Sequence, residues 1–243
     1  MFALFKKEIN AYFSNITGYI VIMLFLLATN LFMWVFPGEM NILDGGYANI
    51  DTLFVVGPFI FMFLIPAVSM RMFAEEKKNG TIELLFTRPI TESTVIAAKY
   101  LAGITIIIFA LLPTLFSFIS VYYLGALMGN IDTGGTWGSY IGLLLLALLY
   151  MAIGLFASSV TDSQIFAFLI SLAIIFFFYL GFDYISPLLY YGNLKSLAMN
   201  AGISVHYRSL SRGVIDSRDV FYFGGVILTF LMFTRIVLLS RKW

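Results

Sequence analysis

Six long apolar stretches constrain this chain more than any other feature of its sequence. A membrane-spanning helix needs about 20 residues, because it crosses about 30 Å of hydrocarbon at about 1.5 Å per residue. Of the 243 residues, 61% are apolar and only 11% are charged, so a water-soluble globular domain could not bury this surface. The predicted spans are residues 18–36, 53–70, 96–124, 140–160, 165–182 and 220–240.

These stretches predict an all-α, polytopic membrane protein with one domain over residues 1–243. Each stretch is too long and too continuously apolar for the strands of a transmembrane β-barrel. Pro113 is expected to kink the third span, because proline removes a helix hydrogen bond. Residues 1–15 are predicted to form an amphipathic helix in the cytoplasmic interface. Its apolar side chains at helical spacing are Phe2, Phe5, Ile9, Tyr12 and Phe13.

The Lys and Arg residues are distributed unequally between the two sides of the predicted bundle. With both termini on the inner side, that side carries ten of the 14 basic residues and the outer side carries four. Because cytoplasmic loops are enriched in Lys and Arg, we expect both termini in the cytoplasm of a bacterial inner membrane. The ten are Lys6, Lys7, Arg71, Lys77, Lys78, Arg88, Lys99, Arg235, Arg241 and Lys242; the four are Lys195, Arg208, Arg212 and Arg218.

Several chemistries are excluded by what the sequence lacks. There is no cysteine, no phosphate-binding loop of the G-x-x-x-x-G-K-[ST] type, no H-E-x-x-H and no G-x-S-x-G. The lone His206 is interpreted as a solvated or hydrogen-bonding residue rather than a catalytic or metal-binding one. The net charge of +1 gives no basic field for nucleic acid. We therefore predict a protein that is not an enzyme and holds no metal or cofactor of its own.

The predicted spans contain almost no ionisable side chains. Between Lys99 and Arg235 the acidic and basic residues fall in loops or at span ends, and only Arg235 lies within a span. Ion-coupled carriers need such groups at membrane depth, so the energy for any transport must come from a separate protein. Gly154 and Ser158 are interpreted as a helix-packing pair. Polar residues that could line a path are Asn30, Ser117, Ser120, Ser171 and Tyr179.

The stretch after the second span, residues 75–90, carries the most information. Gly80 permits a turn, Thr81 is placed to begin a short helix, and Pro89 ends it. Thr91 can cap the helix that follows. Glu83 points away from an apolar face, so the helix is either buried in lipid headgroups or fits a groove in a cytoplasmic partner. The apolar face consists of Ile82, Leu85 and Phe86.

This stretch resembles the coupling-helix signature of type-2 ABC-exporter permeases. The run E-E-x-x-x-G-T-I-E-L-L-x-x-x-P-I follows the second span, and the resemblance extends over the whole chain. Within that family the chain is most similar to the permease of the gliding-motility ABC transporter of Bacteroidetes, and also to permeases of nitrous-oxide-reductase maturation. The outer run at residues 210–220, which contains R-G-V-I-D-x-R-D-V, carries this finer resemblance.

The resemblance implies a permease that pairs in the membrane with a second subunit. That subunit is another permease, a larger membrane protein or a second copy of this chain. The permease also docks on a separate ATPase, which binds ATP and Mg. A non-transporting membrane scaffold driven by the ATPase stays open as the alternative, and the cargo is not indicated. By motif, residues 71–94 form the coupling loop. The coupling residues are Glu75, Glu76, Gly80, Thr81, Ile82, Glu83, Leu84, Leu85, Phe86 and Pro89.

The outer segment, residues 183–219, has two interpretations. Family members fold it into short re-entrant helices that cap the translocation path, with Leu188 to Tyr191 dipping into the interface. The other interpretation is a solvated cap in which Arg218 pairs with Asp216 and Asp219. The residues assigned to this outer cap are Arg208, Arg212, Gly213, Asp216 and Arg218.

Overall fold

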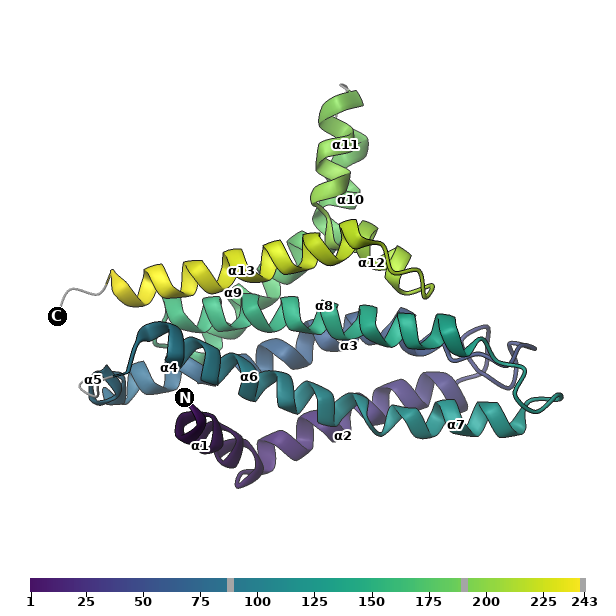
Figure 1. Cartoon of the computed structure of the whole chain (residues 1–243), viewed down its shortest axis with the longest axis horizontal. Coiled ribbons are helices and arrows are strands. Elements are labelled where there is room, and N and C mark those ends of the chain that lie inside the picture. The colour runs from purple at the N-terminus through teal and green to yellow at the C-terminus, as the bar shows by residue number, and fades with distance from the viewer. Residues whose placement is uncertain (87–89, 189–191, 241–243) are drawn as a thin grey trace.

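The computed structural model describes residues 1–86, 90–188 and 192–240, except for the side chains of residues 84–86. This part of the chain contains helices and no strand (Figure 1). Most helices run along one long bundle axis. The helices are α1 (Phe2–Phe13), α2 (Ile16–Asn30), α3 (Asp51–Ser69), α4 (Arg71–Lys78), α5 (Thr81–Phe86), α6 (Glu92–Leu111), α7 (Thr114–Leu124), α8 (Thr133–Val160), α9 (Gln164–Phe176), α10 (Phe182–Ile185), α11 (Gly192–Ala201), α12 (Ile203–Leu210) and α13 (Ser217–Leu239). Two π-helical turns, Leu31–Val35 and Phe177–Gly181, extend α2 and α9, and a 3-10 turn spans Ser186–Leu188.

Six helical segments of the described chain are long and apolar enough to cross a membrane, which confirms the six predicted stretches. Several are longer than predicted, because polar residues at their ends continue the helix. The segments are Ile16–Val35, Asp51–Lys78, Glu92–Leu124, Thr133–Val160, Gln164–Leu188 and Ser217–Leu239.

Helix α8 is the centre of the bundle. In its most apolar 18-residue window, 72% of the residues are buried inside the chain, against 22% for α13. Side chains on all sides of α8, such as Leu146, Leu149, Tyr150 and Met151, are fully buried. A helix that is apolar all round can be covered completely, and here α3, α6, α9 and α13 cover it.

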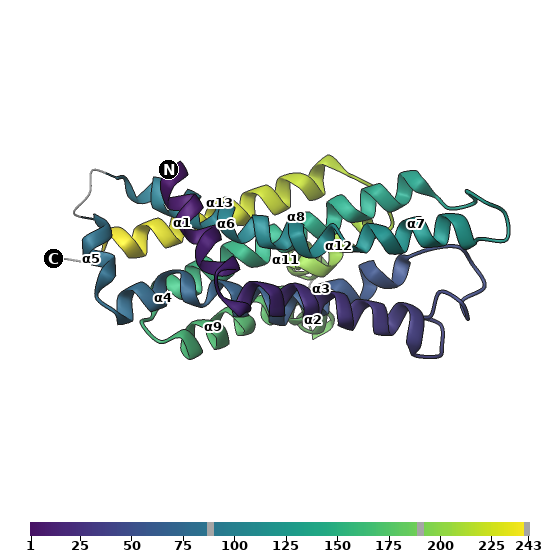
Figure 2. The same ribbon diagram turned by 90° about the horizontal axis from the view of Figure 1, so that it is seen from below.

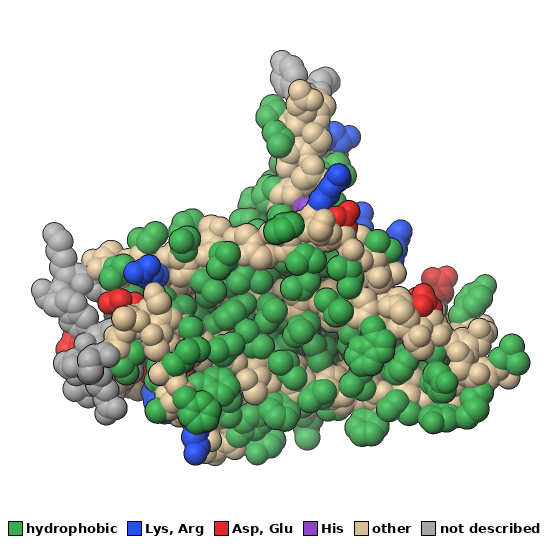
Figure 3. All heavy atoms as spheres, viewed as in Figure 1, with side chains coloured by type: hydrophobic (Ala, Val, Ile, Leu, Met, Phe, Trp, Pro, Cys, Tyr) green, Lys and Arg blue, Asp and Glu red, His purple; other side chains and the backbone are tan. Residues whose placement is uncertain are grey.

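The outer surface of the bundle is apolar, as a membrane protein requires. Figure 3 shows hydrophobic side chains over most of the visible lateral face, with charged groups near the end that carries α5, on the projecting outer segment and toward the opposite end. We call the end that carries α5 the α5 end of the bundle. Large exposed side chains such as Phe116 and Phe166 would be unstable in water but are stable against lipid.

Three prolines within the spans differ in their effect on the helix. Pro58 and Pro66 lie inside α3, which stays helical through both. Pro113 separates α6 from α7, so the predicted distortion of the third span is confirmed as a break between two helices. The physical cause is the missing N–H of proline, together with the clash of its ring with the preceding turn.

Helix α1 lies across the bundle rather than along it, near the α5 end (Figure 2). Leu4, Glu8 and Tyr12 are buried, and they follow one another at intervals of four residues on one helical face. The predicted amphipathic helix is therefore present. The face turned into the protein is different from the expected one, however, because Phe2 is 77% exposed and Tyr12 is the only fully buried member of the predicted apolar set.

The outer segment is helical and projects from the bundle. Helix α11 points away from the bundle axis in Figure 1, whereas α12 packs against α8 and α13. Residues 189–191 lie outside the described residues, so the predicted placement of Leu189, Tyr190 and Tyr191 in the interface stays a prediction. Leu188 is 78% exposed.

Candidate functional site

The candidate site is the α4–α5 hairpin at the α5 end of the bundle. Gly80 has a φ of +68°, in the left-handed region that glycine adopts at no steric cost, and its N–H donates to the Lys77 carbonyl at 3.1 Å. The Thr81 hydroxyl donates to the Glu76 carbonyl at 3.3 Å. The predicted turn at Gly80 and the helix starting at Thr81 are therefore confirmed. Together they fold α5 back from the end of α4.

Helix α5 is held to its own chain by Ile82. This side chain is only 5% exposed and belongs to the apolar core, whereas Thr81 and Glu83 are exposed. Ile82 therefore anchors α5, and it is not on the free surface where the sequence placed it. The side chains of Leu84, Leu85 and Phe86, and all of Pro89, lie outside the described residues.

The chain leaves the hairpin through a capped helix. Thr91 has an extended backbone and its hydroxyl oxygen accepts from the Thr94 N–H at 3.4 Å, which confirms Thr91 as the N-cap of α6. The cap sets the direction in which α6 enters the bundle.

Helix α4 was predicted as part of a polar loop, and this prediction is wrong. The chain continues helically from α3 into α4, and one α8 side chain holds the junction. The Ser158 hydroxyl accepts from the Phe73 N–H at 2.9 Å and the Ala74 N–H at 3.1 Å, and it donates to the Met70 carbonyl at 3.0 Å. The Lys77 ammonium also donates to the Ser159 carbonyl. The two bonds to the Ser158 hydroxyl satisfy backbone N–H groups in the first turn of α4, where a helix leaves such groups without a partner of its own.

Gly154, one turn before Ser158, lets α8 approach the same junction closely. A β-carbon added at Gly154 would lie 2.0 Å from the Ser69 hydroxyl oxygen and 2.7 Å from its β-carbon. The predicted packing role of Gly154 and Ser158 is therefore confirmed, and Ser158 has a hydrogen-bonding role in addition.

A buried ion cluster lies between α1, α4 and α6. The Lys99 ammonium is 3.0 Å from both a Glu8 and a Glu76 carboxylate oxygen, and it donates to the Met72 carbonyl at 2.6 Å. The Lys7 ammonium reaches the same carboxylates, at 3.4 Å for Glu8 and 3.0 Å for Glu76. Burial lowers the pKa of Lys7, but the hydrogen bonds and charges of Glu76 and Glu8 raise that pKa above its usual value overall.

This cluster was not predicted from the sequence. Lys99 was assigned to the inner side as an ordinary cytoplasmic charge, whereas its side chain on α6 is 1% exposed. A signal was present in the sequence: Lys99 follows Val95, Ile96, Ala97 and Ala98, where a solvated lysine would be unusual. An ammonium in such surroundings requires buried carboxylates. The partners could not be identified from the sequence, because Glu8 lies 91 residues away.

A polar cavity of about 250 Å³ lies beside the ion cluster, between α1 and α4. Glu75 and Arg71 line it, and an Arg71 guanidinium N–H donates to the Thr17 hydroxyl at 3.1 Å. Glu75 and Glu76 both line this cavity, and Glu76 also belongs to the ion cluster.

The outer cap is held by different pairs from those predicted. The His206 ring contacts an Asp219 carboxylate oxygen at 2.7 Å and the Asn200 carbonyl at 2.9 Å, and it stacks on Tyr222. Asp216 caps α13 by accepting from the Arg218 N–H at 2.9 Å. The predicted pairing of the Arg218 side chain with Asp216 and Asp219 is therefore wrong, because Asp219 pairs with His206. His206 is confirmed as a hydrogen-bonding residue.

The remaining outer-cap residues have separate environments. Arg208 pairs with Asp183 at 3.1 Å. Gly213, at a φ of +79°, packs its backbone directly on Gly135 of α8, where a β-carbon would lie 2.3 Å from the Gly135 α-carbon. Arg212 and Arg218 make no ion pair within the part of the chain that the structure describes. The outer cap is thus a packed structure attached to α8 and α13, and its charges do not form one site.

Comparison with known proteins supplies the family. The sequence profile described as ABC-2 family transporter protein matches residues 38–201, about two thirds of the chain. The match begins before α3 and ends at α11, so it contains the whole α4–α5 hairpin and the central helix α8. A search of curated proteins found no match. The six membrane-spanning segments, the hairpin and the profile match together show that the chain belongs to the ABC-2 family of transporter proteins, as a multi-pass membrane subunit of an ABC transporter.

Proposed function

We propose that this protein is the permease of an ABC exporter in which α5 transmits the movement of a separate ATPase. The observation that carries the proposal is the hairpin at the α5 end and its packing on the bundle. Gly80 turns it, Ile82 anchors it, and Ser158 fixes the base of α4. A short helix held in this way can transmit force into α6 and, through α4, into α3.

The proposed coupling residues divide by role. Gly80 and Thr81 shape the hairpin, while Ile82 and Glu76 attach it to the bundle. Pro89 is proposed to end α5. Glu83 and Leu85, with Leu84 and Phe86, are proposed to meet the ATPase, and Glu75 borders the cavity beside α1. ATP and Mg are proposed to bind only the ATPase, since this chain has no phosphate-binding loop.

We place the α5 end and both termini in the cytoplasm of the bacterial inner membrane. The ratio of ten to four in Lys and Arg supports this orientation. A reporter fused after Trp243 should therefore be cytoplasmic, and one inserted near Asn200 should be periplasmic. Paired alkaline phosphatase and green fluorescent protein fusions measure both sites. A cytoplasmic signal from position 200 would rule out six crossings with this orientation.

The finer biological role rests on the resemblance alone. The run at residues 210–220 supports a place in a gliding-motility transporter, with a second, larger membrane subunit as partner. Permeases of nitrous-oxide-reductase maturation share this resemblance, and a pair of identical permeases is the other assembly. The experiment that separates these assemblies is mass spectrometry of the complex purified through a tag on this chain.

A scaffold without transport is the second candidate function, and one observation favours it. Two of the five polar side chains proposed to line a path bond to the backbone of their own helix. Asn30 donates to the Leu26 carbonyl at 2.7 Å and Ser120 to the Phe116 carbonyl at 2.8 Å. Ser117 contacts Asn30 at 3.4 Å, and Tyr179 is buried. Within the described residues of this single chain, these groups form no continuous polar path.

Inside-out vesicles that contain this protein and its ATPase test the proposed function. We expect ATP-dependent accumulation of at least one solute from a cell extract, detected by untargeted mass spectrometry. The accumulation should survive collapse of the proton gradient by an uncoupler, because the carboxylates of the six segments lie near their ends and not at mid-membrane depth. Accumulation that disappears with the uncoupler at constant ATP would contradict an ATP-driven exporter. ATP hydrolysis that depends on this chain, without accumulation of any solute, would support the scaffold.

A further inference from the structure

Two charged side chains of the polar cavity between α1 and α4 have no charged partner. Arg71 and Glu75, both from α4, line the cavity, and neither makes an ion pair within the described residues. The other charged residues of the lining belong to the ion cluster and neutralise one another: Lys7, Glu8, Glu76 and Lys99. The cavity therefore offers one positive and one negative group to a ligand.

The protein satisfies the Arg71 guanidinium only in part. A guanidinium carries several N–H donors, and that of Arg71 donates to the Thr17 hydroxyl at 3.1 Å. Its Nε–H is buried and has no hydrogen-bond partner among the described residues. Because the Thr17 oxygen accepts the bond from Arg71, the hydroxyl hydrogen of Thr17 stays available to a ligand. A guanidinium beside a hydroxyl donor is an arrangement that suits a phosphate group.

Arg71 and Glu75 lie at different levels along the bundle axis. Arg71 directly follows the apolar stretch 53–70, and Thr17 is the second residue of the first membrane-spanning segment, so both lie where the hydrocarbon ends. Glu75 comes four residues later on α4, which places it about 6 Å further from the hydrocarbon. A phospholipid has the same order, with its acyl chains first, then the phosphate, then the terminal group of the head. A terminal ammonium would therefore lie at the level of Glu75.

An apolar groove continues from this point into the membrane-spanning part of the bundle. It has a volume of about 570 Å³ and lies along α2 and α3, which run side by side (Figure 2). Residues seven apart share one face of a helix, so Leu24 of the groove lies on the α2 face of Thr17. Leu64 of the groove lies in the same way on the face of Arg71. Acyl chains attached to a headgroup in the cavity can therefore lie in this groove.

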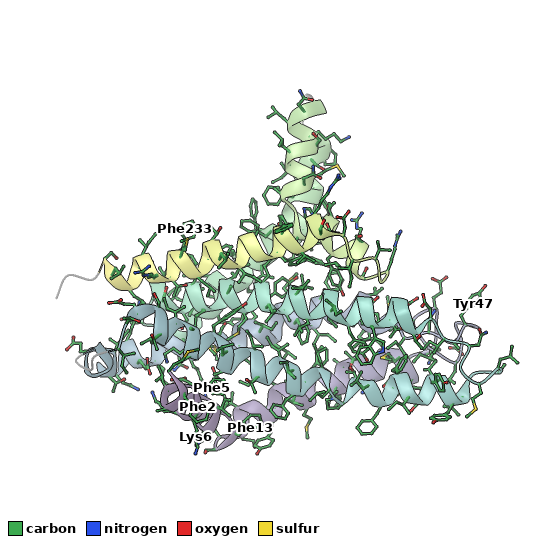
Figure 4. The ribbon with its side chains drawn as sticks, in the orientation of Figure 1. Phe2, Phe5, Lys6, Phe13, Tyr47 and Phe233 are labelled. Atoms are coloured by element: carbon green, nitrogen blue, oxygen red, sulfur yellow. The ribbon has the colours of Figure 1, made fainter. Side chains whose placement is uncertain are left out.

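The cavity opens toward the headgroup layer of the membrane. Figure 4 shows Phe2 and Lys6 of α1 at the lower edge of the molecule, and both are exposed. An aromatic side chain with a lysine beside it is typical of a helix that lies in the membrane interface. The cavity lies between this helix and α4, and its lining residues Ala11 and Asn15 are exposed as well. A lipid can therefore enter the cavity from the side of the bundle.

We propose that the cavity binds the headgroup of a phosphoethanolamine lipid. Arg71 and Thr17 donate hydrogen bonds to the phosphate, Glu75 accepts from the terminal ammonium, and the acyl chains lie in the groove along α2 and α3. A zwitterion matches one unpaired charge of each sign. An anionic lipid would leave Glu75 without a cation, and a choline lipid has no N–H to donate. This inference concerns only the chain and its membrane, so it does not depend on the proposed function.

The test is native mass spectrometry of the full-length chain, which is purified in detergent, stripped of co-purified lipid and titrated with lipids that carry identical dioleoyl chains. Phosphatidylethanolamine and phosphatidylcholine have the same net charge but differ in the N–H donors of the amine. A hydrogen bond to a charged group changes affinity by about tenfold or more. Phosphatidylethanolamine should therefore bind about tenfold more tightly than phosphatidylcholine or phosphatidylglycerol. Glycerophosphoethanolamine, which has no acyl chains to bury, should bind about 100-fold more weakly than the lipid.

Glu75→Gln is the decisive variant. Glu75 has no ion pair among the described residues, so its neutralisation leaves no buried charge without a partner. The preference for phosphatidylethanolamine over phosphatidylcholine should fall to about twofold, because a neutral acceptor forms a weaker bond with an ammonium. Arg71→Gln should weaken the binding of all three lipids by about tenfold. Unchanged melting temperatures in detergent establish that the variants are folded.

Lys6→Gln is the matched control, since Lys6 is an exposed cation on α1 that does not line the cavity. Its lipid affinities and the preference for phosphatidylethanolamine should equal those of the native chain. If Arg71→Gln does not fold, the comparison of Glu75→Gln with Lys6→Gln still decides.

Three results would overturn the proposal. The first is equal binding of phosphatidylethanolamine and phosphatidylcholine by the native chain, or a preference that Glu75→Gln retains. The second is tighter binding of phosphatidylglycerol, which would mean that the cavity recognises negative charge alone. The third is binding of glycerophosphoethanolamine as tight as that of the lipid, which would make the occupant a soluble phosphate ester.

Discussion

Replacing Leu85 by aspartate is expected to abolish binding of the ATPase while the protein still inserts into the membrane. The residue lies on α5, outside every membrane-spanning segment, so insertion does not depend on it. A carboxylate in a desolvated contact without a partner is unfavourable by several kcal/mol, which is enough to dissociate an ordinary interface. The measurement is recovery of the ATPase when the complex is purified through a tag on this chain.

Glu83→Gln is the matched control for this prediction. Glu83 is an exposed neighbour on the same short helix. Loss of a rim charge of this kind is usually worth no more than about 1 kcal/mol, so most of the ATPase should still be recovered. Full recovery and full function of the Leu85→Asp protein would mean that α5 is a lipid-facing helix. Loss of the protein from the membrane fraction would mean that Leu85 supports folding instead.

Gly154→Ala is expected to destabilise the bundle core. The added β-carbon would lie 2.7 Å from the Ser69 β-carbon, and rotating the Ser69 hydroxyl away cannot relieve that contact. Overpacking of this kind lowers the free energy of unfolding by about 1–3 kcal/mol. Alanine stabilises a helix by about 1 kcal/mol relative to glycine, which offsets part of this loss. The melting temperature in detergent, followed by size-exclusion chromatography after heating, should fall.

Gly225→Ala provides the opposite expectation in the same protein. A β-carbon at Gly225, within α13, would meet no atom within 4 Å, so only the gain in helix propensity applies and the melting temperature should stay the same or rise. Adding Ser69→Gly to Gly154→Ala should restore much of the lost stability, because it removes the atoms in conflict. Equal effects of the two alanine substitutions would show that α3 and α8 do not approach each other closely at Gly154.

The local features of this fold were predictable because short-range physics determines them. A long apolar stretch must be helical in hydrocarbon, since only a helix satisfies its backbone within one segment, and all six predicted stretches are helical. The turn at Gly80, the cap at Thr91 and the break at Pro113 depend on the backbone of a few neighbouring residues. The amphipathic helix at residues 1–15 was found by its periodicity for the same reason.

Errors arose where a distant residue decides the local structure. Residues 71–78 are polar enough to suggest a loop, yet Ser158 from α8 caps them as a helix. Asp219 has Arg218 beside it in the sequence, but it pairs with His206 across two helices. Ile82 was expected on a free surface, and its burial depends on how α5 folds back onto the bundle. In each case the nearest residue in the sequence was not the nearest in space.

The sequence by itself determined the class of protein, the number of spans and the hairpin at Gly80. It also determined the family resemblance, which the profile match confirms at the level of the ABC-2 family. Only the tertiary structure decided that α8 is central, that Lys99 is buried and that α1 is attached to the coupling hairpin. The physical reason is that a uniformly apolar helix has no polar face to orient it. Its neighbours are selected by close approaches such as Gly154 on Ser69 and by buried polar pairs such as Glu8 with Lys99, and both join residues far apart in the chain.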